Sequence, residues 1–397
     1  MLTQHDNIVL EKIGPLWIDS QYRDTKDPCP VFDGKRWHVF GSGGAIGGGI
    51  EEQEVWSILH ASAPAIDGPW SEESTVVLDG LEGKHIAAPG VVYEKGIFHM
   101  LVQTEFLSAG GTIKYLTSDD GGATFVLQNT ALHSIEGTHE AALYDPHPAI
   151  IRGQKYMTYS GSEFIEKVEN PIMENYGDTS VGTEGWEPWV GKPDIYLAKS
   201  ESNTWAGPWT RMGKILDQEE VAHHNQRDHL SYEWGLEGSQ LIELPSGIIV
   251  MNAVCFLPHG EYGTRQRVFF AFAENVMGPY RSAGTVVHTD KEWESGENGH
   301  AAVFMRGPDM VMFYQGRPPK LEPWRYGIAY FDIKALEKIG RSTLRHYKEL
   351  AKASTQTNNK KVAKLSRTLL YSRPGLVWSD RTRILRATLR QFRRSKK

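Results

Sequence analysis

The sequence has little cysteine and no long apolar run. Its 397 residues contain only Cys29 and Cys255, too few for a disulfide framework, and no CxxC pair is present for zinc or redox chemistry. No run of eighteen apolar residues occurs, which argues against a membrane-spanning helix. The opening residues MLTQHDNIVLEKIG carry acids where a signal peptide has a basic and then an apolar stretch. We therefore expect a cytoplasmic protein in a reducing compartment.

Positive charge is scarce in most of the chain and concentrated at one end. The formal net charge is −6. Residues 341–397 contain 17 Lys and Arg but only Glu349 and Asp380 as acids, a balance of +15, which leaves 26 basic and 47 acidic residues, or −21, before them. An acidic body does not favour binding to nucleic acid, which needs clustered Lys and Arg. We expect no nucleic-acid partner.

One sequence motif, which we call the phrase, recurs five times in the first 340 residues. Each copy has a small or acidic leading residue, an apolar strand, a turn with glycine and a second aromatic-rich strand. The copies begin at Asp27, Ala88, Asp145, Glu237 and Gly299. Each copy reads as a β-hairpin, and Gly-Pro-aromatic tripeptides such as Gly68-Pro69-Trp70 mark further strands outside three of the hairpins. Five such units predict an all-β protein, a five-bladed β-propeller; a β-sandwich does not explain a fivefold phrase.

The two regions of opposite charge predict two parts. Residues 1–340 are expected to form the propeller, a catalytic domain, and residues 341–397 a basic, partly helical C-terminal extension. Residues 335–349, 359–371 and 380–394 have helix-compatible sequences. The last of these places apolar residues on one face and arginines around it, as in basic amphipathic helices. The extension is expected to bind an anionic membrane surface or an acidic partner, the first making the protein a peripheral membrane protein; docking on the acidic body and disorder are the alternatives.

The leading residues carry the candidate chemistry. The inner strands of a propeller line its channel, so Asp27, Asp145 and Glu237 should meet although they are far apart in sequence. Carboxyl groups that share one cavity do not all ionise, so an acid and a base can coexist there. Such a pair suits cleavage of a glycosidic bond. Glu233 is the alternative to Glu237.

These phrases, over residues 20–335, resemble those of the five-bladed propeller glycosidases of glycoside hydrolase family 43 and its relatives in families 32, 62, 68 and 117. The resemblance implies an inverting hydrolase similar to arabinofuranosidases or xylosidases. It implies that Asp27 is the general base, Glu237 the general acid, and Asp145 the residue that tunes the pKa of the acid and orients substrate. His300 resembles a histidine that the family places near a central calcium ion or water cluster. No cofactor is expected to be required, and calcium is the ion that the resemblance suggests at His300.

A carbohydrate substrate needs flat apolar faces and polar contacts. We expect Trp186 and Trp189, in a long loop before residue 194, to stack on the sugar together with Trp234, and His147 to contact it beside Asp145. One alternative is a phosphorylase or transglycosylase, which basic residues in the channel mouth would favour: Arg23, Lys26, Arg227, Arg265 and Arg317. The other is a propeller that binds carbohydrate without catalysis.

Overall fold

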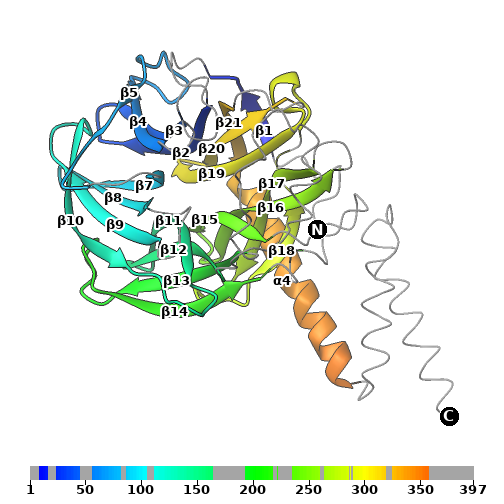
Figure 1. Cartoon of the computed structure of the whole chain (residues 1–397). Coiled ribbons are helices and arrows are strands. Elements are labelled where there is room, and N and C mark those ends of the chain that lie inside the picture. Colours follow the sequence, from blue (N-terminus) through cyan, green and yellow to red (C-terminus); the bar gives the residue numbers. More distant parts are fainter. Residues whose placement is uncertain are drawn as a thin grey trace, which may run out of the picture.

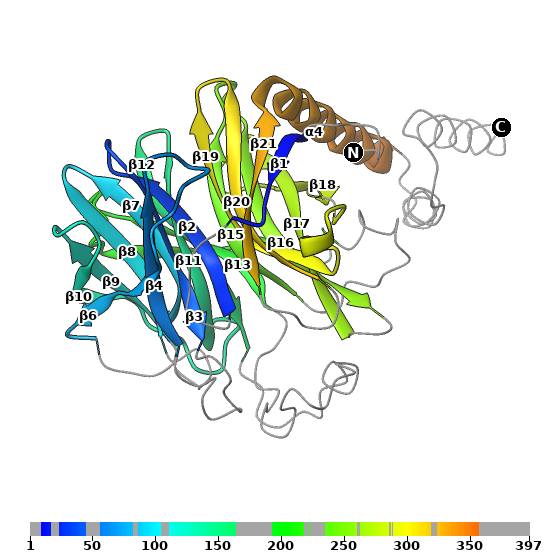
Figure 2. The same ribbon diagram turned by 90° about the horizontal axis from the view of Figure 1, so that it is seen from above.

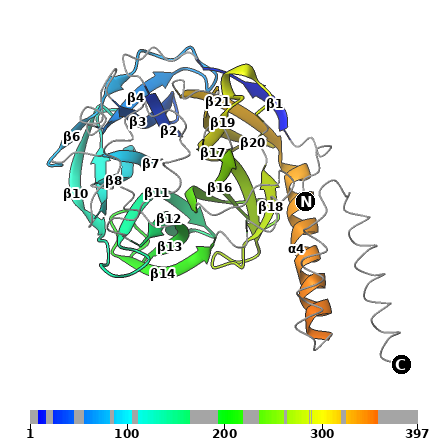
Figure 3. The same cartoon turned by 45° about the vertical axis from the view of Figure 1, so that its right-hand side comes forward.

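The computed structural model describes residues 9–16, 24–44, 56–81, 86–104, 111–163, 193–217, 221, 235–259, 263–285, 287, 289–318 and 324–356. Within these ranges the strands form five sheets that stand around a central channel like the blades of a propeller (Figures 1 and 3). The prediction of an all-β, five-bladed propeller is confirmed.

Each blade contains four antiparallel strands, named here from the channel outward, and the second blade has a fifth strand at its outer edge. The first contains β2 (Asp24–Phe32), β3 (Trp37–Gly44), β4 (Trp56–Ala63) and β5 (Ser74–Thr75). The second contains β7 (Ala87–Glu94), β8 (Ile97–Thr104), β9 (Thr112–Ser118) and β10 (Thr124–Leu132), and β6 (Val77–Asp79) pairs in parallel with its outer strand. The third contains β11 (Ala142–Ile151), β12 (Gln154–Ser162), β13 (Asp194–Ser200) and β14 (Trp209–Leu216). The fourth contains β15 (Leu236–Glu243), β16 (Ile249–His259), β17 (Gly263–Ala273) and β18 (Arg281–Thr285).

The fifth blade joins the two ends of the propeller. It contains β19 (Glu297–Arg306), β20 (Asp309–Arg317) and β21 (Arg325–Asp332), preceded by the short 3₁₀ helix η2 (Glu292–Glu294). Its outermost strand is β1 (Val9–Ile13), from the other end of the sequence, which pairs antiparallel with β21. The ring is therefore closed by hydrogen bonds between the beginning and the end of the propeller sequence.

The core lies between the blades. In β16 and β17 successive residues alternate between two apolar clusters: Val250 and Phe270 pack toward the fifth blade, whereas Met251 and Phe269 pack toward the third. Side chains of a strand point to opposite faces in turn. Because a neighbouring blade covers each face, these strands are apolar on both sides.

Helix α4 (Ile333–Gln356) follows the last strand and lies against the outside of the ring near β17, β18 and β21 (Figure 2). Leu336 and Leu344 join the core cluster of the fourth and fifth blades. Gly340 allows the close approach, because a Cβ atom there would lie 2.8 Å from Phe272 Cδ1. The helix includes the predicted segment 335–349 and crosses residue 340, where we expected the propeller to end. The other two predicted helical segments lie outside the described residues.

No described helix is both long enough and apolar enough to span a membrane.

Candidate active site

All five inner strands carry a bulge at the same level of the channel. The register with the second strand shifts in β2, β7, β11, β15 and β19. One residue in each bulge has a positive φ angle, which is uncommon for residues other than glycine and is often found at functional sites. These residues are Asp27 (54°), Ala88 (51°), Asp145 (48°), Gly238 (58°) and His300 (28°).

The bulges correct the sequence alignment of the five phrases. Asp27, Ala88 and Asp145 occupy equivalent positions as expected, but Gly238 and His300 take the place expected of Glu237 and Gly299. Glu237 therefore stands one residue before the bulge. Its carboxylate still reaches the channel, because it contacts the ring of His300.

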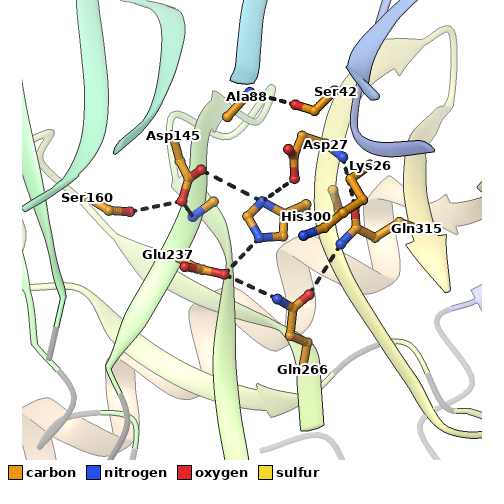
Figure 4. Close-up of polar contacts among 12 residues, drawn as sticks. Lys26, Asp27, Ser42, Ala88, Asp145, Ser160, Glu237, Gln266, His300 and Gln315 are labelled. Carbon is orange, nitrogen blue, oxygen red and sulfur yellow. Dashed lines mark hydrogen bonds and ion pairs between the residues drawn. The ribbon is translucent and has the colours of Figure 1, made fainter. Parts of the chain in front are cut away.

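The imidazole of His300 is the centre of the site (Figure 4). Its Nδ1 atom lies 3.1 Å from Asp27 Oδ1 and 4.0 Å from Asp145 Oδ1, and its Nε2 atom lies 2.8 Å from Glu237 Oε1. The structure thus brings together the three predicted carboxylates and the predicted histidine, which come from four different blades. Their side chains are between 9% and 20% exposed, so the cluster is largely shielded from solvent.

The charge of His300 follows from the three carboxylates around it. Burial disfavours the charged ring, but the negative charges of Asp27, Glu237 and Asp145 outweigh burial and raise the pKa of His300 to about 10. The ring is therefore an imidazolium at neutral pH; its Nε2 donates a hydrogen bond to Glu237, and its Nδ1 forms an ion pair with Asp27.

Asp145 is the most deeply held carboxylate. Its Oδ2 atom accepts hydrogen bonds from the Gly238 backbone N–H at 3.1 Å and from the Ser160 hydroxyl at 3.5 Å. Burial raises the pKa of Asp145 to about 7, with His300 opposing the shift and Glu237 and Asp27 adding to it. Near neutral pH this carboxyl is therefore poised between its two protonation states.

Side chains from neighbouring blades hold the bulges in place. The Asp27 N–H donates to Gln315 Oε1 at 2.7 Å, the Asp145 N–H donates to Gln103 Oε1 at 2.6 Å, and the Ala88 N–H donates to the Ser42 hydroxyl at 2.7 Å. A further glutamine, Gln266 on β17, donates from Nε2 to Glu237 Oε1 at 3.2 Å. These residues were not predicted from the sequence. Their only signal is a polar residue inside an otherwise buried strand.

A metal ion is a second way to occupy this centre. Asp145, Glu237 and His300 offer ligand atoms that all lie within 4.8 Å of one another. Calcium prefers oxygen ligands, so the carboxylates of Asp145 and Glu237 fit it better than the ring of His300 does. The calcium site stays a prediction.

The remaining predicted site residues lie elsewhere or outside the described ranges. His147 is partly buried beside the cluster, with Nε2 4.0 Å from Cys29 Sγ, and burial lowers its pKa to about 4. The ring is thus neutral near pH 7 and lies beside Cys29. Trp186, Trp189 and Trp234 are outside the described residues.

Of the basic residues expected at the mouth, the side chains of Lys26 and Arg317 are described. Both lie over the ring of Trp324, at 6.0 and 4.4 Å from its centroid. Arg317 also forms an ion pair with the buried Glu297, which compensates its charge.

Comparisons with known proteins give the fold a name. A scan against protein-family models and a search of curated proteins found no match. Among solved structures, the catalytic domain of the Coprinopsis cinerea GH62 alpha-L-arabinofuranosidase matches with a TM-score of 0.57 at 14% identity, over 82% of this chain and 98% of that chain. A thermostable family-43 glycoside hydrolase matches with a TM-score of 0.54 at 16% identity, over 77% of this chain and 89% of that chain. The Cellvibrio cellulosa alpha-L-arabinanase complexed with arabinohexaose matches with a TM-score of 0.51 at 12% identity, over 80% of this chain and 98% of that chain.

At these identities the comparisons establish the fold. The chain has the five-bladed propeller fold found in glycoside hydrolase families 43 and 62, as the resemblance implied.

Proposed function

We propose that the protein is a glycoside hydrolase that cleaves an arabinofuranoside or a xyloside with inversion at the anomeric carbon. The observation that carries the proposal is the convergence of Asp27, Asp145 and Glu237 on one imidazolium ring. Two carboxyl groups in different protonation states are what hydrolysis of a glycosidic bond needs. The fold, shared with arabinofuranosidases and an arabinanase, supports the same substrate class.

Asp27 is assigned as the general base. It activates a water molecule, which attacks the anomeric carbon from the face opposite the leaving group. His300 separates Asp27 from Glu237, since the two carboxylates bond to different nitrogens of the ring. A hydrogen bond, an ion pair and the width of a ring favour the separation of inverting enzymes, roughly 6.5–9.5 Å, over the roughly 5–5.5 Å of retaining enzymes.

Glu237 is assigned as the general acid, which gives its proton to the departing sugar oxygen. Asp145 is assigned a supporting role by its position: its Oδ2 accepts a hydrogen bond from the backbone N–H of Gly238, the residue after Glu237. Three carboxyl groups around one imidazolium hold more negative charge than the ring compensates. This excess favours the retention of one proton in the site.

We prefer hydrolysis to transfer to phosphate. A phosphorylase needs free positive charge at the channel mouth, and among the basic residues expected there Arg317 is already compensated by Glu297; the side chains of Arg23, Arg227 and Arg265 lie outside the described part of the chain. Binding of carbohydrate without catalysis is the other alternative, and the turnover measurement below separates it from hydrolysis.

The test is a panel of aryl glycosides and of oligosaccharides that contain arabinose, xylose, galactose or fructose, each with and without phosphate. Wild type is expected to release sugar from an arabinoside or xyloside without phosphate, and ¹H NMR should show the inverted anomer first. Glu243→Gln, on the same strand as Glu237 but paired with Arg152 on the outside, is the matched control for Glu237→Gln. Release that depends on phosphate supports the phosphorylase. Tight binding of a sugar without turnover supports the non-catalytic alternative.

A further inference from the structure

A chain of hydrogen bonds links the backbone of Asp27 to the side chain of Glu237 (Figure 4). The Asp27 N–H donates to Gln315 Oε1 at 2.7 Å, and Gln315 Nε2 donates to Gln266 Oε1 at 3.3 Å. Gln266 Nε2 then donates to Glu237 Oε1 at 3.2 Å. Both glutamines are buried, with 0% and 8% of their surface exposed.

The donor and acceptor roles along this series of hydrogen bonds are fixed at its Asp27 end. A backbone N–H can only donate, so Gln315 must present its oxygen to Asp27 and its NH₂ group to Gln266. Gln266 must therefore present its own oxygen to Gln315 and its NH₂ group to Glu237. The orientation of both amides follows from the backbone of Asp27.

Glu237 Oε1 consequently accepts two hydrogen bonds. One comes from Gln266 and the other from His300 Nε2 at 2.8 Å. Two donor hydrogens occupy the two lone pairs of this oxygen, so a proton on the carboxyl group has to reside on Oε2.

We propose that Gln266 and Gln315 are positioning residues that make Oε2 of Glu237 the proton-donating atom. This proposal rests on the proposed function. In the reaction, the Oε2–H bond breaks as its proton moves to the glycosidic oxygen, and that oxygen takes the electrons of the broken bond to the anomeric carbon. Water forms the new bond to this carbon and gives a proton to Asp27.

The test compares substrates whose leaving groups differ in their need for protonation. With Gln266→Met, kcat should fall at least tenfold for an alkyl glycoside or oligosaccharide, and no more than about twofold for a dinitrophenyl glycoside, whose leaving group departs without an acid. Gln315→Met should have the same effect to a smaller degree. Equal losses for both substrate types, or no loss for either, would overturn the proposal.

Gln240→Met is the matched control. The amide of Gln240 joins the fourth and fifth blades through the Val303 N–H and C=O, but it contacts no carboxylate of the site. It should lower stability as Gln266→Met does and leave the leaving-group dependence unchanged.

A second readout does not need turnover and so separates this proposal from the proposed function. The side-chain amide resonances of Gln266 and Gln315 should shift in Glu237→Gln, while that of Gln240 should not. Unshifted Gln266 resonances would overturn the hydrogen-bond chain even if the protein proves to be a glycosidase. Shifted resonances in a protein without any turnover would support the series of hydrogen bonds and contradict the proposed function.

An independent observation concerns the outward side of α4. Six of its basic residues are exposed, and their spacing of 4, 3, 4, 3 and 4 places them on one line along the helix. We call this line the basic face: Lys334, Lys338, Arg341, Arg345, Lys348 and Lys352. The opposite side of the helix, with Leu336 and Leu344, is packed against the blades.

The basic face fits a flat anionic surface. Residues 334 to 352 span about 27 Å at a rise of 1.5 Å per residue, and α4 extends beyond the ring of blades in Figures 1 and 3. Arg341 pairs with Glu337 and Lys348 with Glu274, but both pairs are exposed and contribute little. Because the apolar side is used for packing, α4 can lie on a bilayer but not insert into it.

We propose that the basic face binds the headgroups of anionic lipids. Residues 357–397 add 13 Lys and Arg against Asp380 alone, so the same end of the chain carries further positive charge. Nucleic acid fits less well, since the basic face has no aromatic ring for base stacking and residues 1–340 carry a net charge of −21.

Flotation with vesicles tests this second proposal on the full chain. Binding is expected to vesicles of phosphatidylcholine with about a third phosphatidylserine, to weaken with salt, and to be absent with phosphatidylcholine alone. The triple variant Lys338→Glu, Arg345→Glu and Lys352→Glu should bind at least tenfold more weakly. A control with the same charge change on exposed turns and loops, Lys35→Glu, Lys95→Glu and Lys291→Glu, should bind as wild type. Equal binding of the two triple variants, or preference for soluble heparin over vesicles, would overturn the proposal.

Discussion

His300 Nε2 lies 2.8 Å from Glu237 Oε1, so the residue at the centre of the channel holds the carboxylate assigned as the acid by a charged hydrogen bond. The other ring nitrogen is directed at Asp27. One imidazolium therefore fixes the relative positions of the two groups that the proposed reaction needs.

Removal of this ring should affect stability and activity in ways that depend on pH. His300→Gln leaves three carboxyl groups without a central positive charge, and we expect a loss of at least a hundredfold in kcat. Because the pKa of His300 is raised to about 10 in the folded protein, its contribution to stability is complete below the unfolded value near 6.5 and is lost as pH rises through about 10. The melting temperature of wild type should thus fall between pH 7 and 10, and that of His300→Gln should fall less. Parallel curves would contradict the imidazolium assignment.

Asp145→Asn should separate stability from catalysis. Burial raises the pKa of Asp145 to about 7, so the folded state holds a proton that the unfolded state loses near pH 4. Wild type therefore loses stability as pH rises from about 4 through 7, and the variant should be more stable than wild type at pH 8. Its activity should fall at least tenfold. Thermal melts of both proteins at pH 4 and pH 8 measure the first effect. The prediction is contradicted if the stability of the variant relative to wild type is lower at pH 8 than at pH 4.

Chelation should not abolish the proposed activity. Because His300 is charged and both of its nitrogens are directed at carboxylates, the site is held together without a metal ion. After dialysis against a chelator, sugar release and melting temperature should be unchanged. Inactivation that added calcium reverses would instead support the calcium site that the family resemblance suggests.

Gly90→Ala tests the packing beneath Asp145. A Cβ atom at Gly90 would lie 2.2 Å from the Pro146 carbonyl oxygen and 3.0 Å from His147 Cα, so backbone atoms of the third blade would have to move. Overpacking of this kind costs roughly 1–3 kcal/mol. Chemical denaturation should show this loss, and kcat should fall because the displaced backbone carries Asp145. A variant with wild-type stability would contradict the tight contact between these blades.

The fold was predictable from sequence because its signal repeats. Five copies of one phrase, each with a glycine turn, reveal the architecture even when each copy is weak. The closing strand β1 is different: its five residues VLEKI carry no copy of the phrase, and only the pairing with β21 identifies it. The start of α4 at Ile333, before the expected boundary, likewise depends on packing against the blades.

The residues of the site could be predicted from the sequence, but their geometry could not. Asp27, Asp145 and Glu237 could be selected because carboxylates at the head of inner strands must face the channel. The position of Glu237, one residue before its bulge, could not be predicted. The bulge is set by the φ angle of Gly238 and not by a residue pattern. Gln266 and Gln315 are single glutamines in apolar strands, and only the contacts between blades reveal their partners.

The most direct test of the central claim is the kcat of Asp27→Asn and Glu237→Gln on the glycoside that wild type hydrolyses, with Glu243→Gln as control. The account predicts that both site variants keep the wild-type fold and lose at least a thousandfold in kcat for a substrate with a poor leaving group, while the control stays within about twofold. Folded Asp27→Asn or Glu237→Gln protein with wild-type turnover would contradict the assignment of base and acid.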